Sequence, residues 1–122
     1  MLNLDTHILL YALQDELTVK ENKLLSSQPW SISGIVLWEI SKLVEIGRIE
    51  FDIDSYEFAK VISKLHIWPI TLEICKTIQT LDFDSDPADE IIAATSLFHK
   101  TPLVTRDKKI LCSKKVLFPR SL

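Results

Sequence analysis

The sequence predicts an α/β fold, with helices packed against a sheet of mostly parallel strands. Short runs of β-forming residues alternate with helical patterns along the chain, which is the order typical of parallel sheets. The chain has 122 residues, of which 47% are hydrophobic and 25% charged, so it can bury a sizeable core. That length suits a single domain over residues 1–122 and leaves no room for a second.

Helix and strand signals divide the first half of the chain. Thr18 and Glu21 have the spacing of a capping box, the reciprocal hydrogen-bonding pattern that begins many helices. Ser33 can cap a later helix, and Gly47 is placed to end it. The elements expected here, in order, are a strand, two helices, a strand and two helices: Met1–Leu4, Thr6–Leu13, a helix after Thr18, Trp30–Ser33, Ser33–Ile46 and Ser55–Leu65.

The strongest helix start lies in the second half of the chain. Proline is favoured at the first helical position, and Asp86 before Pro87 is placed as the N-cap. The elements expected here are a strand, two helices, a strand, a helical turn and a last strand: Ile67–Ile70, Thr71–Thr80, Pro87–His99, Leu103–Thr105, Lys108–Leu111 and Val116–Phe118.

Composition excludes several classes of protein. Only two glycines are present, which argues against a glycine-rich phosphate-binding loop of the P-loop or Rossmann type. No apolar run approaches the roughly 18 residues that a membrane span needs, and the N-terminus lacks a signal-peptide pattern, so we expect a cytoplasmic protein. Cys75 and Cys112 are expected to be small buried side chains, and Trp30, Trp38 and Trp68 are expected to pack within or beside the core.

Charge is distributed unevenly along the chain. The net charge is −3, but residues 100–122 contain seven basic residues and one acid, a net charge of +6, so the rest carries −9. A protein with this distribution can bind phosphates through its basic end and metal ions through its acidic centre. A solvated basic tail explains the same residues equally well. The candidates for contacts with a nucleic-acid backbone are Lys108, Lys109, Lys114 and Lys115.

Two aspartates occupy matching places at opposite ends of the chain. Asp5 directly follows the strand Met1–Leu4, and Asp107 leaves the strand Leu103–Thr105. In open parallel sheets, ligands bind beyond the carboxyl ends of the strands, where the strand order reverses. If these two strands are neighbours, Asp5 and Asp107 face each other at that point. The alternative is that each aspartate only caps the helix or turn that follows it.

Asp89 belongs to a dense group of acids at the start of the helix Pro87–His99. It lies in the first helical turn, where the helix dipole favours a negative charge and is a sufficient explanation by itself. The number of acids in this segment needs a further explanation, because five carboxylates within nine positions repel one another unless a cation or solvent relieves the repulsion. Asp82 and Asp84 are expected to be solvated loop acids, and Asp86 is expected to be a cap. The other two acids of the group are Asp89 and Glu90.

Glu39 is the least expected acid because it borders the apolar stripe of its helix. At 100° per residue it lies about 40° from Leu43 and about 60° from Val36. A carboxylate against apolar surface costs free energy unless it is paired or binds a metal ion. A salt bridge to Lys42 is the alternative explanation.

Together these acids form a set of oxygen ligands with no cysteine or histidine cluster beside it. Carboxylates alone favour Mg²⁺ or Mn²⁺ over Zn²⁺. His7, His66 and His99 have no ligand spacing and are expected to be surface or structural residues, with His7 the one adjacent to the site. The sequence therefore predicts that Asp5, Glu39, Asp89 and Asp107 gather around divalent cations.

Four segments in the same order resemble motifs of the PIN-domain family, in particular its VapC-type toxins. They are Leu4–Leu10, Trp38–Ile40, Asp86–Thr95 and Leu103–Asp107, and they span essentially the whole chain. The first and third are specific in combination, whereas the second is weak alone. Carried over motif by motif, the family's catalytic and metal-binding acids fall on Asp5, Glu39, Asp89 and Asp107, with Thr6 and Thr105 as auxiliary polar groups.

The resemblance implies a PIN-like three-layer α/β/α sandwich, a homodimer, and RNA cleavage that depends on Mg²⁺ or Mn²⁺. It also implies a type II toxin–antitoxin pair, in which a small antitoxin protein blocks the site. One departure is Glu90, which stands where many relatives have arginine; it adds negative charge and is expected to alter RNA contacts.

Two other classes of protein share part of this pattern. A receiver-type phosphoacceptor also gathers acids at strand ends, but it needs an aspartate after a middle strand, and Ile67–Ile70 is not followed by one. A PIN-derived module that binds RNA or protein without cutting is the other alternative. Retention of all four acids disfavours it.

Overall fold

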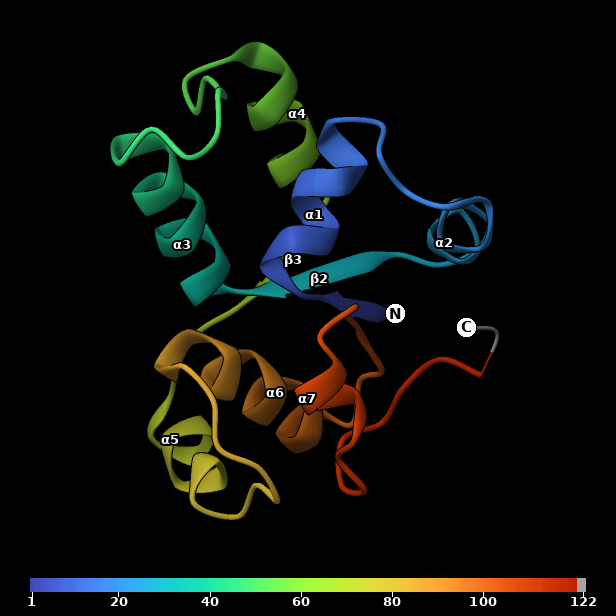
Figure 1. Cartoon of the computed structure of the whole chain (residues 1–122), viewed down its shortest axis with the longest axis vertical. Helices are drawn as coiled ribbons and strands as arrows, with labels where there is room; N and C mark the ends of the chain where they lie inside the picture. Colours follow the sequence, from blue (N-terminus) through green and yellow to red (C-terminus); the bar gives the residue numbers. More distant parts are fainter. Residues whose placement is uncertain (121–122) are drawn as a thin grey trace.

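Four parallel strands form the central sheet of the structure, a computed structural model that describes residues 1–120 (Figure 1). The strands are β1 (Leu2–Leu4), β2 (Trp30–Ser33), β3 (His66–Trp68) and β4 (Leu103–Val104), in the order β3-β2-β1-β4. β1 pairs with β2 on one side and with β4 on the other, so the strand order reverses beside β1. The last two residues of the expected domain 1–122 lie outside the described residues.

Helices cover both faces of this sheet, which gives the expected three layers. Figure 1 shows α1, α3 and α4 on one side and α5, α6 and α7 on the other. Among the described residues, no helix is both long enough and apolar enough to cross a membrane. The helices are α1 (Thr6–Leu13), α2 (Val19–Leu25), α3 (Gly34–Glu45), α4 (Tyr56–Ser63), α5 (Leu72–Ile78), α6 (Pro87–His99) and α7 (Lys108–Leu111).

Local signals set several of the element ends. The Thr18–Glu21 capping box is present: Glu21 N donates to the Thr18 hydroxyl at 3.1 Å, and Thr18 N donates to Glu21 Oε1 at 2.9 Å. Gly47 follows α3 with a φ of 75°, a conformation that glycine adopts without the strain of a Cβ. β3 ends at Trp68, earlier than expected, because Pro69 has no N–H to donate to the ladder.

The strand expected at Val116–Phe118 is wrong. The described chain makes one backbone hydrogen bond to β4 there, from Leu103 N to Leu117 O at 2.9 Å, and forms no ladder. The Ser113 hydroxyl accepts the backbone N–H of Lys115 and of Val116, both at 3.2 Å. These bonds form a turn, so the apolar residues that follow are not part of a strand.

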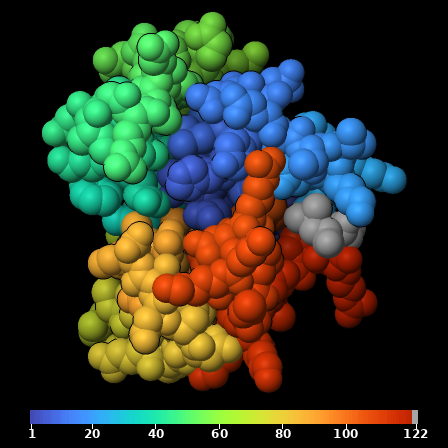
Figure 2. Space-filling model, viewed as in Figure 1, coloured from blue at the N-terminus to red at the C-terminus, as the bar shows by residue number. Residues whose placement is uncertain are grey.

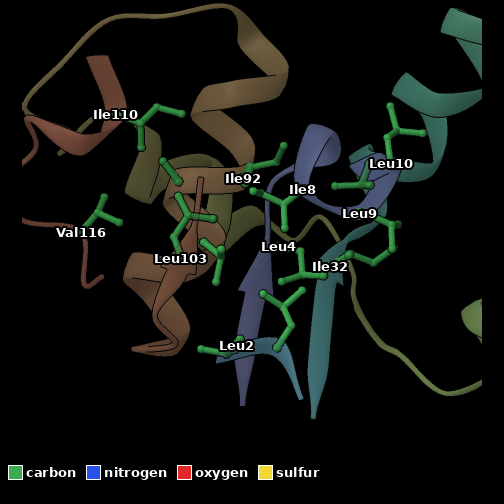
Figure 3. Packing of buried hydrophobic residues seen from close by; sticks show 14 of the residues in the cluster. Leu2, Leu4, Ile8, Leu9, Leu10, Ile32, Ile92, Leu103, Ile110 and Val116 are labelled. Carbon is green, nitrogen blue, oxygen red and sulfur yellow. The ribbon is translucent and has the colours of Figure 1, made fainter. Parts of the chain in front are cut away.

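The hydrophobic core surrounds β1, whose three residues are all fully buried. Figure 3 shows Leu2, Leu4 and Leu103 packed among residues of α1, α6 and α7. Burial of one such leucine stabilises the fold by about 1.5–3 kcal/mol. Asn3, between the two leucines, donates to the Ser96 hydroxyl at 2.9 Å and so meets α6 through a buried polar contact. The strand that leads to Asp5 is therefore held on both faces.

Two cysteines expected in the interior lie at the surface, and one tryptophan expected to pack within or beside the core is largely exposed. Cys75 and Cys112 are both exposed and unpaired within the described residues, so the expectation that they are buried is wrong. On α5 only Ile74 is buried, and the next residue, Cys75, faces outward. Trp38 is 55% exposed on the outer face of α3, whereas Trp30 and Trp68 are half-buried.

Candidate active site

The turn after β1 places Asp5 in the interior at the carboxyl edge of the sheet. Asp5 is 6% exposed, and its backbone N donates to Val104 O of β4 at 3.1 Å. Its carboxylate accepts from Thr6 N at 2.8 Å and from the Thr105 hydroxyl at 2.7 Å. Burial raises the pKa of Asp5, and the nearby charge of Asp107 adds to this, while the hydrogen bonds oppose it.

The turn after β4 places Asp107 opposite Asp5, and Thr105 joins the two turns. The Thr105 hydroxyl donates to Asp5 and accepts from Asp107 N at 3.1 Å. Asp107 caps α7, because its Oδ1 accepts from Lys109 N at 2.8 Å and from Ile110 N at 3.4 Å. The capping role considered for both aspartates is thus present, and in neither case does it remove the side chain from this edge.

Glu39 meets the same edge from α3. Its Oε1 accepts a short hydrogen bond of 2.5 Å from the Thr6 hydroxyl. The expected alternative, a salt bridge to Lys42, is wrong, since Lys42 pairs with Glu45 at 3.4 Å. Burial raises the pKa of Glu39, with further contributions from the charges of Asp89 and Asp5. Glu39 therefore sits with acids and not with a cation.

Asp89 approaches from the first turn of α6. Its Oδ2 accepts from the Ser85 hydroxyl at 3.0 Å, while Glu90 accepts from Ser85 N at 3.1 Å. Burial raises the pKa of Asp89, as do the charges of Asp5, Asp107 and Asp86. Glu90 thus fixes the loop before α6. Asp86 occupies the N-cap position of α6, but its side chain makes no capping hydrogen bond.

All four acids line one open cavity of about 440 Å³. Figure 2 shows that segments from the two ends of the chain, blue and orange, lie against each other on this face of the molecule. Sequence reasoning missed part of the lining. The sequence predicts only a capping role for Asp86 and includes Arg106 among the basic residues of 100–122, although its place between Thr105 and Asp107 puts it at the same edge. The other lining residues are His7, Ile8 and Tyr11.

The four candidate lysines do not line this cavity. All of them are exposed on α7 or just after it. The Lys115 amine donates to Thr80 O at 2.5 Å, and Lys114 N donates to Asp82 at 2.7 Å. These bonds tie the segment after α7 to the loop before α6.

The donor chemistry of the cavity fits a hard divalent cation. Carboxylate and hydroxyl oxygens are the ligands that Mg²⁺ and Mn²⁺ prefer. Desolvation and mutual repulsion raise the pKa of three of the acids, and a bound cation relieves both. Across residues 1–120, no three acidic, histidine or cysteine side chains are already close enough to enclose an ion.

Comparison with known proteins identifies the fold. The chain resembles a toxin–antitoxin complex from Klebsiella pneumoniae with a TM-score of 0.70 and 21% identity, over 92% of this chain and 91% of that one. It resembles VapBC2 from Rickettsia felis, bound to a DNA fragment from the promoter, with a TM-score of 0.75 and 18% identity over 98% of both chains. It also resembles FitAcB from Neisseria gonorrhoeae, with a TM-score of 0.68 and 16% identity over 98% of this chain and 97% of that one.

A sequence comparison with curated proteins gives no match. The family model described as PIN domain matches residues 3–115, which include all but the first residue of β1 and every other strand and helix of the described residues. The chain belongs to the PIN domain family.

Proposed function

We propose that this chain, as a single PIN domain over 1–122, is a metal-dependent endoribonuclease whose carboxylates hold Mg²⁺ or Mn²⁺. PIN domains are generally nucleases. One observation carries the proposal: carboxylates from four separate segments line one cavity, and burial together with mutual charge raises the pKa of three of them. The proposed catalytic and metal-binding residues are Asp5, Glu39, Asp89 and Asp107.

The protein's own part in this chemistry is to hold the carboxylates in place. Thr6 orients Glu39, Thr105 orients Asp5, and Ser85 orients Asp89, each through a hydroxyl that donates a hydrogen bond. A bound divalent cation supplies an acidified water and stabilises charge on the phosphate and leaving oxygen. No side-chain nucleophile is required, and the described residues that line the cavity include no cysteine, serine or lysine.

RNA is the proposed substrate, and the basic surface after β4 is its proposed contact. Lys108, Lys109, Lys114 and Lys115 are exposed beside an acidic cavity that repels phosphate when no cation is bound. Their attraction to the backbone is independent of sequence, which suits a role in affinity and not in the choice of cleavage site.

A small antitoxin protein and a second copy of this chain are the proposed partners, in the cytoplasm. The antitoxin is supported by the similar structures, which are toxin–antitoxin complexes. An arginine from such a partner can pair bidentately with two of the carboxylates and compete with metal. The dimer is supported by exposed apolar side chains, among them Trp38 at 55% and Leu72 at 64%. Copurification with the product of the neighbouring gene tests the antitoxin, and the solution mass tests the dimer.

The experiment for the nuclease is a cleavage assay on RNA with and without divalent cations. We expect cutting in Mg²⁺ or Mn²⁺ and none in excess EDTA, with activity restored when the cation is replaced. An Asp89→Asn preparation, purified in parallel, controls for contaminating nuclease. The metal mechanism would be contradicted if the wild-type protein cut RNA as fast in EDTA as in Mg²⁺ while the Asp89→Asn preparation did not cut it.

A further inference from the structure

Arg106 stands among acids in the cavity, and the proposed function gives it no role. It lies in the turn between Thr105 and Asp107. Among the described residues that line the cavity, it is the one side chain with a permanent positive charge. The same lining contains five carboxylates, so a phosphate entering the cavity meets repulsion from every charged residue except Arg106 and any bound cation: Asp5, Glu39, Asp86, Asp89 and Asp107.

The guanidinium of Arg106 is held on one edge by Glu21. Arg106 Nε donates to Glu21 Oε2 at 2.8 Å, and Nη2 donates to Oε1 at 2.6 Å. The Glu21 side chain is only 8% exposed, and the Arg106 contact holds the pKa of that carboxyl below its usual range. Glu21 is itself fixed by the capping box with Thr18 at the start of α2. The carboxylate is therefore a rigid support.

Two further contacts hold the guanidinium, one on its planar face and one at Nη2. Its central carbon lies 4.0 Å from the centre of the Tyr11 ring, a cation–π contact, and Nη2 also donates to Glu16 O at 3.2 Å. Within residues 1–120, Nε and Nη2 are the Arg106 nitrogens that donate well-formed hydrogen bonds, and the Tyr11 side chain, which helps to raise the pKa of Arg106, is the other polar group against the guanidinium. The Arg106 side chain remains 40% exposed. The contacts thus fix the plane of the group and leave one nitrogen, with two N–H donors, for a ligand.

We propose that Arg106 binds a phosphate of the RNA backbone beside the cleaved linkage, using Nη1, while Glu21 and Tyr11 hold the guanidinium in position. A fixed, planar guanidinium suits a phosphate oxygen better than a flexible ammonium does, because little side-chain entropy is lost on binding. The salt bridge with Glu21 alone explains why α2 is tied to the turn after β4. It does not explain why the tied cation lines the cavity. This proposal rests on the proposed ribonuclease function.

The test pairs changes in the protein with the removal of single phosphate charges from the RNA. A fluorescent single-stranded RNA carries one neutral methylphosphonate linkage, moved along the strand, with 2′-O-methyl at that sugar in both the neutral and the phosphate versions. Binding is measured by anisotropy in Mg²⁺ with Asp89→Asn protein, which is expected to bind without cutting, and gels verify that the strand is intact. If the strand is cut, the same scan is followed as cleavage rate.

The Asp89→Asn protein is the parent into which the further substitutions are introduced. We expect one methylphosphonate position to weaken RNA binding by this parent about tenfold, the effect of losing one charge-assisted hydrogen bond at a half-exposed site. In the Arg106→Gln variant, the methylphosphonate at that position should no longer weaken RNA binding, while methylphosphonates at the other positions should have the same effects as in the parent. Arg48→Gln, an equal change of charge at an exposed residue outside the cavity, should show the parental pattern. Glu21→Gln and Arg106→Lys should show the position-specific effect reduced but present.

Two results would overturn the proposal, and they differ in what else they affect. If Arg106→Gln, shown by circular dichroism to be folded, keeps the full parental pattern, Arg106 only ties α2 to the turn. If Arg106→Gln fails to fold, the same result in a folded Arg106→Met variant, which also lacks the charge, leads to the same conclusion. The proposed nuclease then stands. If the parent protein does not bind RNA in any form, both the role of Arg106 and the proposed substrate fail together.

Discussion

The turns after β1 and β4 are built from similar local sequence, yet their aspartates occupy different environments. Both turns run from a strand through an aspartate that caps a helix, α1 in one case and α7 in the other. Asp5 is 6% exposed, and burial raises its pKa, whereas Asp107 is half-buried and uses Oδ1 to cap its helix. Local sequence therefore places a carboxylate at a strand end, but the surrounding fold decides the free energy of its charge.

The largest expected effect is one that the two aspartates share. Asp5→Asn and Asp107→Asn should each lower RNA cleavage about 10³-fold, because each removes a negatively charged ligand from a site that stabilises charge in the transition state. Single-turnover cleavage in Mg²⁺ measures this. Asp84→Asn, an exposed change in the loop before α6, is the matched control and should cut normally. Near wild-type rates in both site variants would show that the site is misassigned.

The stability of the folded protein should separate the two aspartates. Asp5→Asn should raise the melting temperature at neutral pH, because it removes a charge that burial disfavours. Asp107→Ala should instead destabilise the protein by about 1 kcal/mol, the usual effect of losing an N-cap. Thermal unfolding followed by circular dichroism distinguishes them. Equal shifts of the same sign would remove the contrast.

The pH dependence follows from the raised pKa of Asp5. Below the ordinary range of aspartate, both the folded and the unfolded chain hold this proton, so Asp5→Asn and wild type should be equally stable. As pH rises, the unfolded chain loses the proton first, so the wild-type free energy of unfolding falls relative to the variant. The difference becomes constant above the folded pKa. Denaturant unfolding over this range measures it, and a gap that grows toward acid pH would have the wrong sign.

The hydroxyl of Thr105 joins the two turns, and its removal should have a smaller effect. Thr105→Val keeps the shape of the side chain but loses the hydrogen bond to Asp5 and the acceptor for Asp107 N. We expect cleavage to fall about tenfold, the lower range for a group that orients a metal ligand. Thr105→Ser restores the hydroxyl and should restore most of the rate. No recovery in the serine variant would indicate that packing, and not the hydrogen bonds, explains the loss.

The smallest effect on chemistry is expected for the basic surface outside both turns. Replacing Lys108, Lys109, Lys114 and Lys115 by glutamine should weaken RNA binding and lower its salt dependence, since fewer counterions are released. The rate at saturating RNA should change little. Binding at several salt concentrations provides the measurement, and an unchanged salt slope would assign these lysines to ordinary solvated surface.

The sequence was sufficient where local chemistry and strand order together determine position. The Thr18–Glu21 capping box, the Pro87 helix start and the carboxyl-edge rule for Asp5 and Asp107 all rest on nearby residues and on a parallel sheet. Asp5 and Asp107 could therefore be predicted to lie together, and both line one cavity with Glu39 and Asp89.

Tertiary contacts explain what the sequence could not predict. The choice of Glu39 between Lys42 and Thr6 depends on how α3 packs beside α1, which no spacing along α3 reveals. Val116–Phe118 has a strand-like composition, but hydrogen bonds to Ser113 turn the chain there. Arg106 was counted with a basic tail because its partner, Glu21, lies in α2, far away in the sequence.

Direct binding of metal is the measurement closest to the central claim, that these four carboxylates form one cation site. Mn²⁺ titrated into wild-type protein by calorimetry should show saturable binding that strengthens as pH rises, because protonated carboxyls must release their protons. Asp5→Asn, Glu39→Gln, Asp89→Asn and Asp107→Asn should each weaken it at least about tenfold, and Asp84→Asn should not. Wild-type affinity in two or more of the four site variants would contradict the account.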